Sequence, residues 1–580
     1  MRKTLLFIGF LGMTLMAHSQ VIFAVQSPSS IGGNYGFTWA PPSGGWGTPD
    51  FMVPGTYVED TLMMVDDSSA GTNPQGNPVA QEGCNPLVND LTGKIAVIYR
   101  NTCEFGTKAM NAQNAGAVAC IIINREPGLV NMGAGAEGAN VTIPTTFVED
   151  ATGATIVAEM ANGPVVVLIG NKSGLFSDDA GLTASTTLIP RRTGQPSLLS
   201  QSATEFNFEL GARVYNYGIG DQTNASLNAV ITDPTNASVY DETASGLTIL
   251  AGDSVDIYPA LANTLPAFSL ASYSPGTYTL TYTVALDTTD EYVGDNTLST
   301  TFTINDSVWS YAQIDSNGMP MAQNFYRPST NNQTYSICTV LDDPNADRLG
   351  AAGLYFSAST SAASMVPLTG EEMALYLYKW EDSFVDLTTS PTYDMLTPIA
   401  DGFYYFPSDL QNEAVYAPFN TAVALESNQR YLACVQTVNT DLYLGFDGTN
   451  YEWNVNHYLQ PQTPIENDGT YYWAGFGTDL TAGIGIKVFD VANIGLEETS
   501  EIPGMAYPNP ANDMVNISLN AEGNATLVVT DITGKVVLSK SITLSSGKSS
   551  IDLSTIESGL YVFNVTTQSG KKSKFNVVKN

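Results

Sequence analysis

Positively charged residues are scarce in this chain, which holds 22 lysines and arginines against 57 acidic residues and carries a formal net charge of −35. A surface of that sign repels phosphate backbones and anionic lipid, so we exclude nucleic-acid binding. The acidic residues are scattered and form no long run, which is typical of a surface that keeps a protein soluble.

Histidine is scarcer still, with two residues among 580. His18 lies in a segment that we expect to be removed on export, which leaves His457 as the one imidazole of the mature chain. Zinc proteases of the common type need two histidines four residues apart, and a Ser-His-Asp triad needs a histidine that serves a nucleophile motif. His457 has neither, so we predict that the protein is not an enzyme. Paired acids such as 371–372, 381–382 and 342–343 leave a carboxylate-only glycosidase open.

Long apolar runs are missing after residue 19, where no stretch reaches the ~18 apolar residues that a membrane-spanning helix needs. Residues 1–19 predict a signal peptide: Arg2 and Lys3 precede a short apolar segment, and Ala17-His18-Ser19 forms a small-x-small cleavage site. We therefore expect an exported chain that begins at Gln20 and has no transmembrane segment.

The remainder of the sequence predicts a mainly β, multi-domain protein, because 580 residues exceed a single core of ~250–300 residues. We expect an α/β domain at 20–175, an Ig-like β-sandwich at 183–304 and a larger, jelly-roll-like sandwich at 306–490. A polar linker at 491–504 precedes a small all-β domain at 505–580.

The predicted α/β domain contains the clearest alternation of strand and helix. Residues 94–99 (KIAVIY) and 118–124 (VACIIIN) read as buried strands, and the helical stretch 105–115 lies between them. Residues 206–215 and 277–286, in the following block, alternate with period two and predict half-buried antiparallel strands.

Five cysteines enter an oxidising compartment, where disulfides form. Cys84 and Cys103 flank one predicted strand and are the first candidate pair. Cys338 and Cys434 lie in different strands of one region and are a weaker pair. Cys120 lies inside an apolar run and reads as a buried, inert thiol.

The last block resembles the C-terminal sorting domain of the type IX secretion system of Bacteroidetes. The residues that carry the resemblance are Tyr507, Pro508, Asn509 and Pro510 of a YPNPA motif, Gly534 and Lys535 of a GK-V-V turn, and Gly559 and Tyr561 of a closing GLY motif. The resemblance implies recognition by the type IX translocon, followed by attachment to the outer-membrane cell surface or release outside the cell.

The first block resembles the protease-associated (PA) domain over roughly 83–160. Leu91–Ile98, the RNTCEF motif at 100–105, Lys108 and Asn111–Ala117 carry the resemblance, while Asn101 stands where the family usually has glycine. The family is non-catalytic and usually accompanies a protease, where it is thought to guide substrates or hold partners. Residues 20–82 would form an N-terminal extension.

Candidate binding residues occur in two of the blocks. Arg100 and Glu104 form either an exposed ion pair or the rim of a site for a peptide or carboxylate. Tyr376, Tyr378 and Trp380 alternate along one predicted strand and so share a face, which either stacks on sugars or packs the sandwich core.

Calcium is the one cofactor that the sequence suggests. Asp342, Asp343, Asn345 and Asp347 offer oxygen ligands within one loop, although they lack EF-hand spacing. The acidic loop 287–296 and the Asn216-Tyr217-Gly218 turn give the second block a loose resemblance to CARDB-type adhesion modules.

We expect a secreted or cell-surface binding or adhesion protein whose PA and sandwich domains hold extracellular protein, peptide or glycan. Two alternatives are an accessory partner of a secreted protease and a carboxylate-only carbohydrate-active enzyme.

Overall fold

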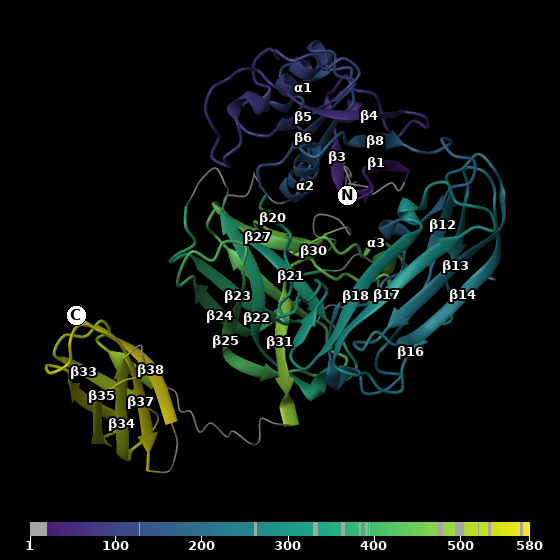
Figure 1. Ribbon diagram of the computed structural model, residues 1–580. Coiled ribbons are helices and arrows are strands. Elements are labelled where there is room, and N and C mark those ends of the chain that lie inside the picture. The colour runs from purple at the N-terminus through teal and green to yellow at the C-terminus, as the bar shows by residue number, and fades with distance from the viewer. Residues whose placement is uncertain are drawn as a thin grey trace, which may run out of the picture. The chain divides into compact units, whose positions relative to one another are not determined.

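The structure is a computed structural model that describes residues 20–126, 128–259, 261, 264–328, 334–360, 366–381, 384–388, 392–393, 395–473, 480–492, 504–519, 521–531, 535–568 and 572–580. The predicted signal peptide, most of the predicted linker and Gly534 lie outside the described residues. The chain divides into two compact units, Met1–Phe489 and Asp490–Asn580 (Figure 1). Its strands form several sheets, which confirms a mainly β, multi-domain fold.

An eight-stranded sheet and two helices form the N-terminal region. The strand order is β2-β1-β8-β4-β5-β6-β7-β3, and strands β4 to β7 run parallel. The elements are β1 (Val21–Ser27), β2 (Gly33–Asn34), β3 (Phe37–Trp39), β4 (Tyr57–Met64), β5 (Ile95–Tyr99), α1 (Phe105–Asn114), β6 (Ala119–Ile123), β7 (Thr145–Val148), α2 (Asp150–Met160) and β8 (Val166–Asn171).

The central strands of this sheet are apolar throughout because both faces are covered. Ile95 and Val97 of β5 pack into the cluster that includes Ile156 of α2. Ala96 and Ile98 alternate with them and pack on the other face, against Ala109 of α1. The predicted strand-helix-strand order is therefore confirmed, and β1 to β3 extend the same sheet.

Antiparallel strands form the sandwich that follows. Strands β14-β13-β17-β18 form one side, and β15-β12-β9 with the pair β11-β16 form the other. Both sides contribute to one core, which includes Phe208, Val214, Leu227 and Phe302. The elements are β9 (Ala180–Gly181), β11 (Asn207–Phe208), β12 (Ala212–Asn216), β13 (Gln222–Thr232), β14 (Ser238–Ile249), β15 (Ser254–Ile257), β16 (Phe268–Ser269), β17 (Gly276–Ala285) and β18 (Thr297–Asn305).

The sheet of β18 continues into the third block through β10, which pairs parallel with β18 and antiparallel with β19. The path goes on as β19-β31-β22-β27-β20, with β25 paired to β22 and β30 paired to β27. These elements are β10 (Gly194–Pro196), β19 (Val308–Ser310), β20 (Asn324–Tyr326), β22 (Leu349–Thr360), β25 (Ala414–Ala424), β27 (Leu442–Asp447), β30 (Thr481–Ala482) and β31 (Gly485–Asp490).

A six-stranded sheet in the order β24-β23-β26-β21-β28-β29 packs against this path over one large apolar core. Its strands are β21 (Tyr335–Leu341), β23 (Glu372–Trp380), β24 (Leu396–Tyr405), β26 (Tyr431–Thr437), β28 (Ile465–Asn467) and β29 (Thr470–Tyr472), and a short helix, α3 (Glu452–Tyr458), lies between β27 and β28 in the chain. Leu375 and Leu377 of β23 enter the core, so the alternate residues of β23 point outward.

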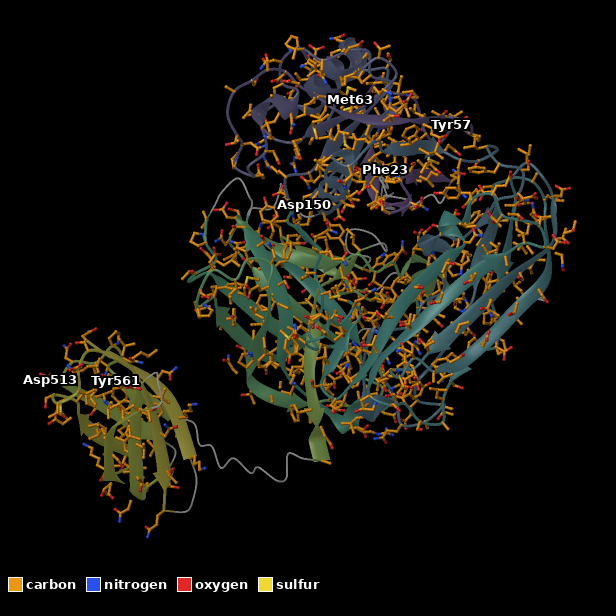
Figure 2. The ribbon with its side chains drawn as sticks, viewed as in Figure 1. Phe23, Tyr57, Met63, Asp150, Asp513 and Tyr561 are labelled. Atoms are coloured by element: carbon orange, nitrogen blue, oxygen red, sulfur yellow. A yellow bond between two sulfur atoms is a disulfide. The ribbon has the colours of Figure 1, made fainter. Side chains whose placement is uncertain are left out.

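The C-terminal unit is a small sandwich of the sheets β32-β33-β36 and β35-β34-β37-β38. Leu527, Phe563 and Tyr561 belong to its core, and Figure 2 labels Tyr561. The strands are β32 (Gly504–Tyr507), β33 (Met514–Leu519), β34 (Gly523–Asp531), β35 (Val536–Leu544), β36 (Lys548–Asp552), β37 (Gly559–Thr567) and β38 (Lys572–Lys579). Across the described residues, no helix is long and apolar enough to cross a membrane.

Candidate functional site

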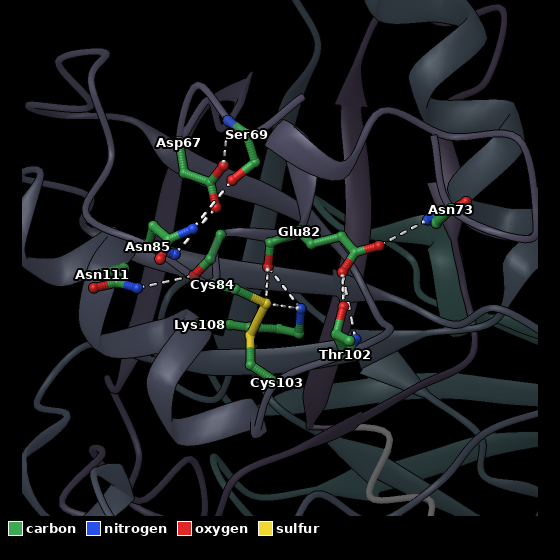
Figure 3. Close-up of a disulfide and its surroundings, with 11 residues drawn as sticks. Asp67, Ser69, Asn73, Glu82, Cys84, Asn85, Thr102, Cys103, Lys108 and Asn111 are labelled. Carbon is green, nitrogen blue, oxygen red and sulfur yellow. Dashed lines mark hydrogen bonds between the residues drawn. A yellow bond between two sulfur atoms is a disulfide. The ribbon is translucent and has the colours of Figure 1, made fainter. Parts of the chain in front are cut away.

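A disulfide joins Cys84 to Cys103 next to the start of α1, as predicted (Figure 3). Lys108, on the buried side of α1, lies beside this bond and is fully buried. Its Nζ donates a 2.6 Å hydrogen bond to the carbonyl of Glu82 and lies 3.6 Å from the Cys84 sulfur. Burial lowers the pKa of Lys108 to about 8.

The carboxylate of Glu82 completes this cluster. It accepts hydrogen bonds from the Thr102 hydroxyl and from Asn73 Nδ2, the latter at 3.1 Å (Figure 3). Burial acts to raise the pKa of Glu82, but these hydrogen bonds outweigh it and hold the pKa below its usual value. Every one of these polar groups is engaged, so the cluster clamps the loops on either side of the disulfide.

Arg100 and Glu104 turn to different partners. Arg100 Nη1 donates to Asn124 Oδ1 at 2.8 Å and lies 3.2 Å from Glu126 Oε1. Glu104 Oε2 accepts a 2.9 Å hydrogen bond from the N–H of Ala136. The structure thus pairs Arg100 with Glu126 rather than with Glu104, and a role for either residue at the rim of a binding site stays a prediction.

Tyr376, Tyr378 and Trp380 share the outer face of the six-stranded sheet, away from the sandwich core. The rings of Tyr376 and Tyr378 stack with centroids 5.7 Å apart, and both side chains are half-buried. Trp380 is buried, because it stacks against Tyr393 at 4.8 Å and against Phe384 at 6.1 Å. Of the three predicted residues, only the two tyrosines are partly exposed, and a binding role for them stays a prediction.

The predicted calcium loop faces guanidinium groups. Asp343 is buried and lies 3.3 Å from Arg192, while Asp342 lies 3.9 Å from Arg430. Asn345 Oδ1 accepts a 3.1 Å hydrogen bond from Arg348, which neighbours Asp347 in the chain. Within the described residues, no group of three or more His, Cys, Asp or Glu side chains is arranged to hold a metal ion. A calcium site at Asp342, Asp343, Asn345 and Asp347 stays a prediction.

The acidic loop 287–296 supplies a buried ion cluster that the sequence did not reveal. Lys172, at the end of β8, lies 2.5 Å from Asp179 and 2.9 Å from Asp295, and all three side chains are at most 9% exposed. The Lys172 ammonium also lies 4.5 Å from the ring centre of Tyr217 and 4.4 Å from that of Tyr292. This cluster joins the N-terminal sheet to the sandwich that follows.

His457 lies on the short helix α3. Its Nε2 forms a short hydrogen bond with Glu209 Oε2, and Asn454 on the same helix exchanges hydrogen bonds of 2.8 and 3.0 Å with the backbone of Ile189. These contacts hold α3 against the preceding sandwich, and His457 is one of the residues that make them.

Hydrogen bonds hold two of the predicted sorting residues, Asn509 and Tyr561, to the backbone of the C-terminal unit. Tyr507 ends β32, and Asn509 of the same motif accepts a 2.8 Å hydrogen bond from the N–H of Val578 and donates one of 2.9 Å to the carbonyl of Asn576. Tyr561 donates a 2.7 Å hydrogen bond to the carbonyl of Glu557. The YPNP segment is thereby fixed to the last strand, β38. The structure also places the remaining sorting residues other than Gly534, which are Pro508, Pro510, Lys535 and Gly559.

Two segments of the chain match known domain families. Residues 58–156 match the PA domain, and residues 505–579 match the secretion system C-terminal sorting domain. The predicted resemblances to the PA domain and to the sorting domain are confirmed, and the loose resemblance of the second block to CARDB-type modules stays a prediction. The sorting domain marks the chain as a protein exported by the type IX system to the cell surface or beyond.

The curated relatives are similar over limited segments. Signal peptide peptidase-like 2 of Arabidopsis thaliana is 33% identical over 88 residues, which are 15% of this chain and 16% of that protein. ER degradation-enhancing alpha-mannosidase-like protein 3 of Homo sapiens is 27% identical over 170 residues, or 27% of this chain and 17% of that protein. The chain thus spans about a sixth of the length of each relative.

Among solved structures, an aminopeptidase from Aneurinibacillus sp. strain AM-1 is similar over 26% of this chain and 30% of that chain. Its sequence identity is 22% and the TM-score is 0.19. A similarity of this extent identifies neither an activity nor a substrate.

Proposed function

We propose that this type IX-exported chain with a PA domain is a non-catalytic cell-surface binding protein that holds extracellular protein, peptide or glycan ligands. The observation that carries the proposal is the outward placement of Tyr376 and Tyr378 on the six-stranded sheet, outside the sandwich core. Aromatic rings that face outward beside polar groups are the usual anchors of binding surfaces.

The clusters around Lys108 and His457 support a non-catalytic role because their polar groups bond to the surrounding scaffold. Lys108 and Glu82 bond to neighbouring loops, and His457 bonds to Glu209. Catalytic acids and bases need a reacting atom within hydrogen-bond reach, and these groups spend their hydrogen bonds on the scaffold instead.

A second candidate function is that of an accessory partner of a secreted protease. The observation that favours it is the PA match at 58–156, together with the clamp formed by Cys84, Cys103 and Lys108, which holds the loops of that domain in one shape. A fixed loop surface suits recognition of a folded partner, since little ordering entropy is lost on binding.

The experiment that tests the proposal uses the purified mature chain, residues 20–580, against arrays of peptides and glycans and against secreted proteases from the same bacterium. We expect saturable binding of at least one ligand class, with the ligand recovered unchanged by mass spectrometry. Recovery of cleaved ligand would favour the carboxylate-only enzyme. A change in the activity of an added protease would favour the accessory role.

A further inference from the structure

The outer face of the six-stranded sheet is organised in rows that its strand register defines. One row runs Phe403, Ala374, Gln436, Ser336, Glu466 and Tyr471 across β24, β23, β26, β21, β28 and β29. The adjacent row runs Asp401, Tyr376, Cys434 and Cys338. Residues that lie directly opposite one another in neighbouring strands point to the same face, so each row projects its side chains together.

One part of this face is covered. Trp380, Cys338, Val340, Leu432 and Cys434 form a buried outer cluster, which includes the Cys338–Cys434 disulfide. Tyr393 stacks between Trp380 and Tyr471, with ring centroids 4.8 and 4.5 Å apart. This cluster covers part of the outer face of the sheet and packs beside the residues that remain exposed there.

The rest of the face is open, and we call it the open aromatic face: Tyr376, Phe403 and Tyr405 with Asp401 and Gln436. The Phe403 and Tyr405 side chains are 49% and 58% exposed, which is high for aromatic residues in the middle of a domain. Figure 1 shows β23 and β24, which carry these rings, as neighbouring strands.

The amide of Gln436, one polar group of the open aromatic face, is held by its neighbours in the same row. Gln436 Nε2 donates a 3.0 Å hydrogen bond to Ser336 Oγ, which in turn donates a 2.7 Å bond to the buried carboxylate of Glu466. This chain fixes the amide of Gln436. Among the described residues, neither Gln436 Oε1 nor the Tyr376 hydroxyl has a hydrogen-bond partner.

We propose that the open aromatic face binds a neutral oligosaccharide, an inference that rests on the binding role proposed above. Aromatic rings pack on the apolar C–H face of a sugar, and the free acceptor of Gln436 and the hydroxyl of Tyr376 suit its hydroxyl groups. A site with apolar walls and a few fixed polar groups is the common form of a small-ligand site.

The charges of the face favour a neutral sugar over an acidic one. Asp401 and Glu372 are both exposed and negative, and the neighbouring cation Lys379 lies 2.7 Å from Glu426. A uronate, sulfate or phosphate group would be repelled by the two carboxylates and by the net charge of −35.

The test is titration of the mature chain, by calorimetry or NMR, with neutral hexose and N-acetylhexosamine oligosaccharides and with a uronate oligosaccharide as the charged comparison. We expect a neutral oligosaccharide to bind and the uronate not to bind. Tyr376→Ala and Phe403→Ala should each weaken binding about tenfold or more, as truncation of an aromatic anchor does. Tyr57→Ala removes a side chain that is 41% exposed on the N-terminal sheet, and it should leave the affinity unchanged.

Circular dichroism and thermal unfolding of each variant confirm that it is folded before its affinity is compared. Binding that survives both Tyr376→Ala and Phe403→Ala would overturn this site while leaving the proposed binding function intact. Tighter binding of the uronate, or binding of a peptide alone at this face, would overturn the choice of ligand. Cleavage of the oligosaccharide would instead contradict the proposed non-catalytic function.

Discussion

Lys172 lies fully buried at the end of β8, with two carboxylates and two aromatic rings around its ammonium. Asp179 and Asp295 share this single cation, so one negative charge of the cluster remains without a matching positive charge. Removing one partner of a buried ion pair leaves an uncompensated charge, whose desolvation is costly.

We therefore predict that Lys172→Ala lowers the free energy of unfolding by about 3–5 kcal/mol. Chemical denaturation followed by tryptophan fluorescence measures the change. The matched control is Lys379→Ala, which removes a lysine whose partner Glu426 is 60% exposed, and it should change stability little. Equal effects of the two substitutions would contradict the conclusion that the Lys172 cation stabilises the buried cluster between the N-terminal sheet and the sandwich.

The same cluster makes stability depend on pH. Burial raises the pKa of Asp179 to about 6 and that of Asp295 to about 7, above the ~3.9 of an unfolded chain. Between about pH 4 and 7 the folded protein holds protons that the unfolded chain releases, so this cluster loses stabilising effect as pH rises through that window.

Asp295→Asn removes the excess charge and keeps an oxygen acceptor for Lys172. We expect the variant to unfold at a higher temperature than the parent at pH 8, and the difference to shrink toward pH 4, where Asp295 is protonated in the parent. Thermal unfolding of both proteins across this range measures it. A difference that does not change with pH, or that grows toward acid, would refute the shared-cation account.

Two disulfides link structural elements to one another, and they close loops of different length. The Cys84–Cys103 bond spans 19 residues and ties the loop before β5 to the start of α1, while the Cys338–Cys434 bond spans 96 residues and joins β21 to β26. In the chain-entropy account, the longer loop gives the larger stabilisation.

Replacing Cys338 and Cys434 by serine should cost about 5 kcal/mol, and replacing Cys84 and Cys103 by serine about 3 kcal/mol. Denaturation of the two double variants gives the comparison. Cys120→Ala, which removes the free buried thiol, is the control that breaks no bond. The reverse order of the two costs would show that local contacts, such as those of Lys108, outweigh loop closure.

Elements with a local signal were predictable from the sequence. The apolar strand and helix patterns at 94–124 correctly predicted β5, α1 and β6. Each pattern marks side chains that are buried against elements nearby in the sequence. Residues 206–215, by contrast, were predicted as one strand but divide into β11 and β12, which pair with β16 and β15. That division is set by partners distant in sequence, which a local pattern does not contain.

The candidate site shows the same limit. The alternation of Tyr376 and Tyr378 predicted a shared face, but the burial of Trp380 depends on Phe384 and Tyr393, which return over the sheet. Phe403 and Gln436 join Tyr376 only through strand register. The cross-strand neighbours of an aromatic residue are therefore the part of a sheet-face site that sequence reasoning misses.

In the whole molecule, the sorting domain and the proposed binding face belong to different compact units. The unit Asp490–Asn580 contains the sorting domain, and Met1–Phe489 contains the PA region and the open aromatic face. We predict that residues 490–580 fused to a periplasmic reporter carry it to the cell surface, and that deletion of 505–580 leaves the chain in the periplasm. Protease accessibility on intact cells measures both outcomes. Surface display of the truncated chain would contradict this division.

We expect the exported protein to bind its ligand without transforming it. The most direct measurement is prolonged incubation of the purified mature chain with the oligosaccharides and peptides that it binds, followed by mass spectrometry of every product. We predict that each ligand is recovered at its original mass, however much protein is added. Cleavage products that increase in proportion to the amount of protein would contradict it.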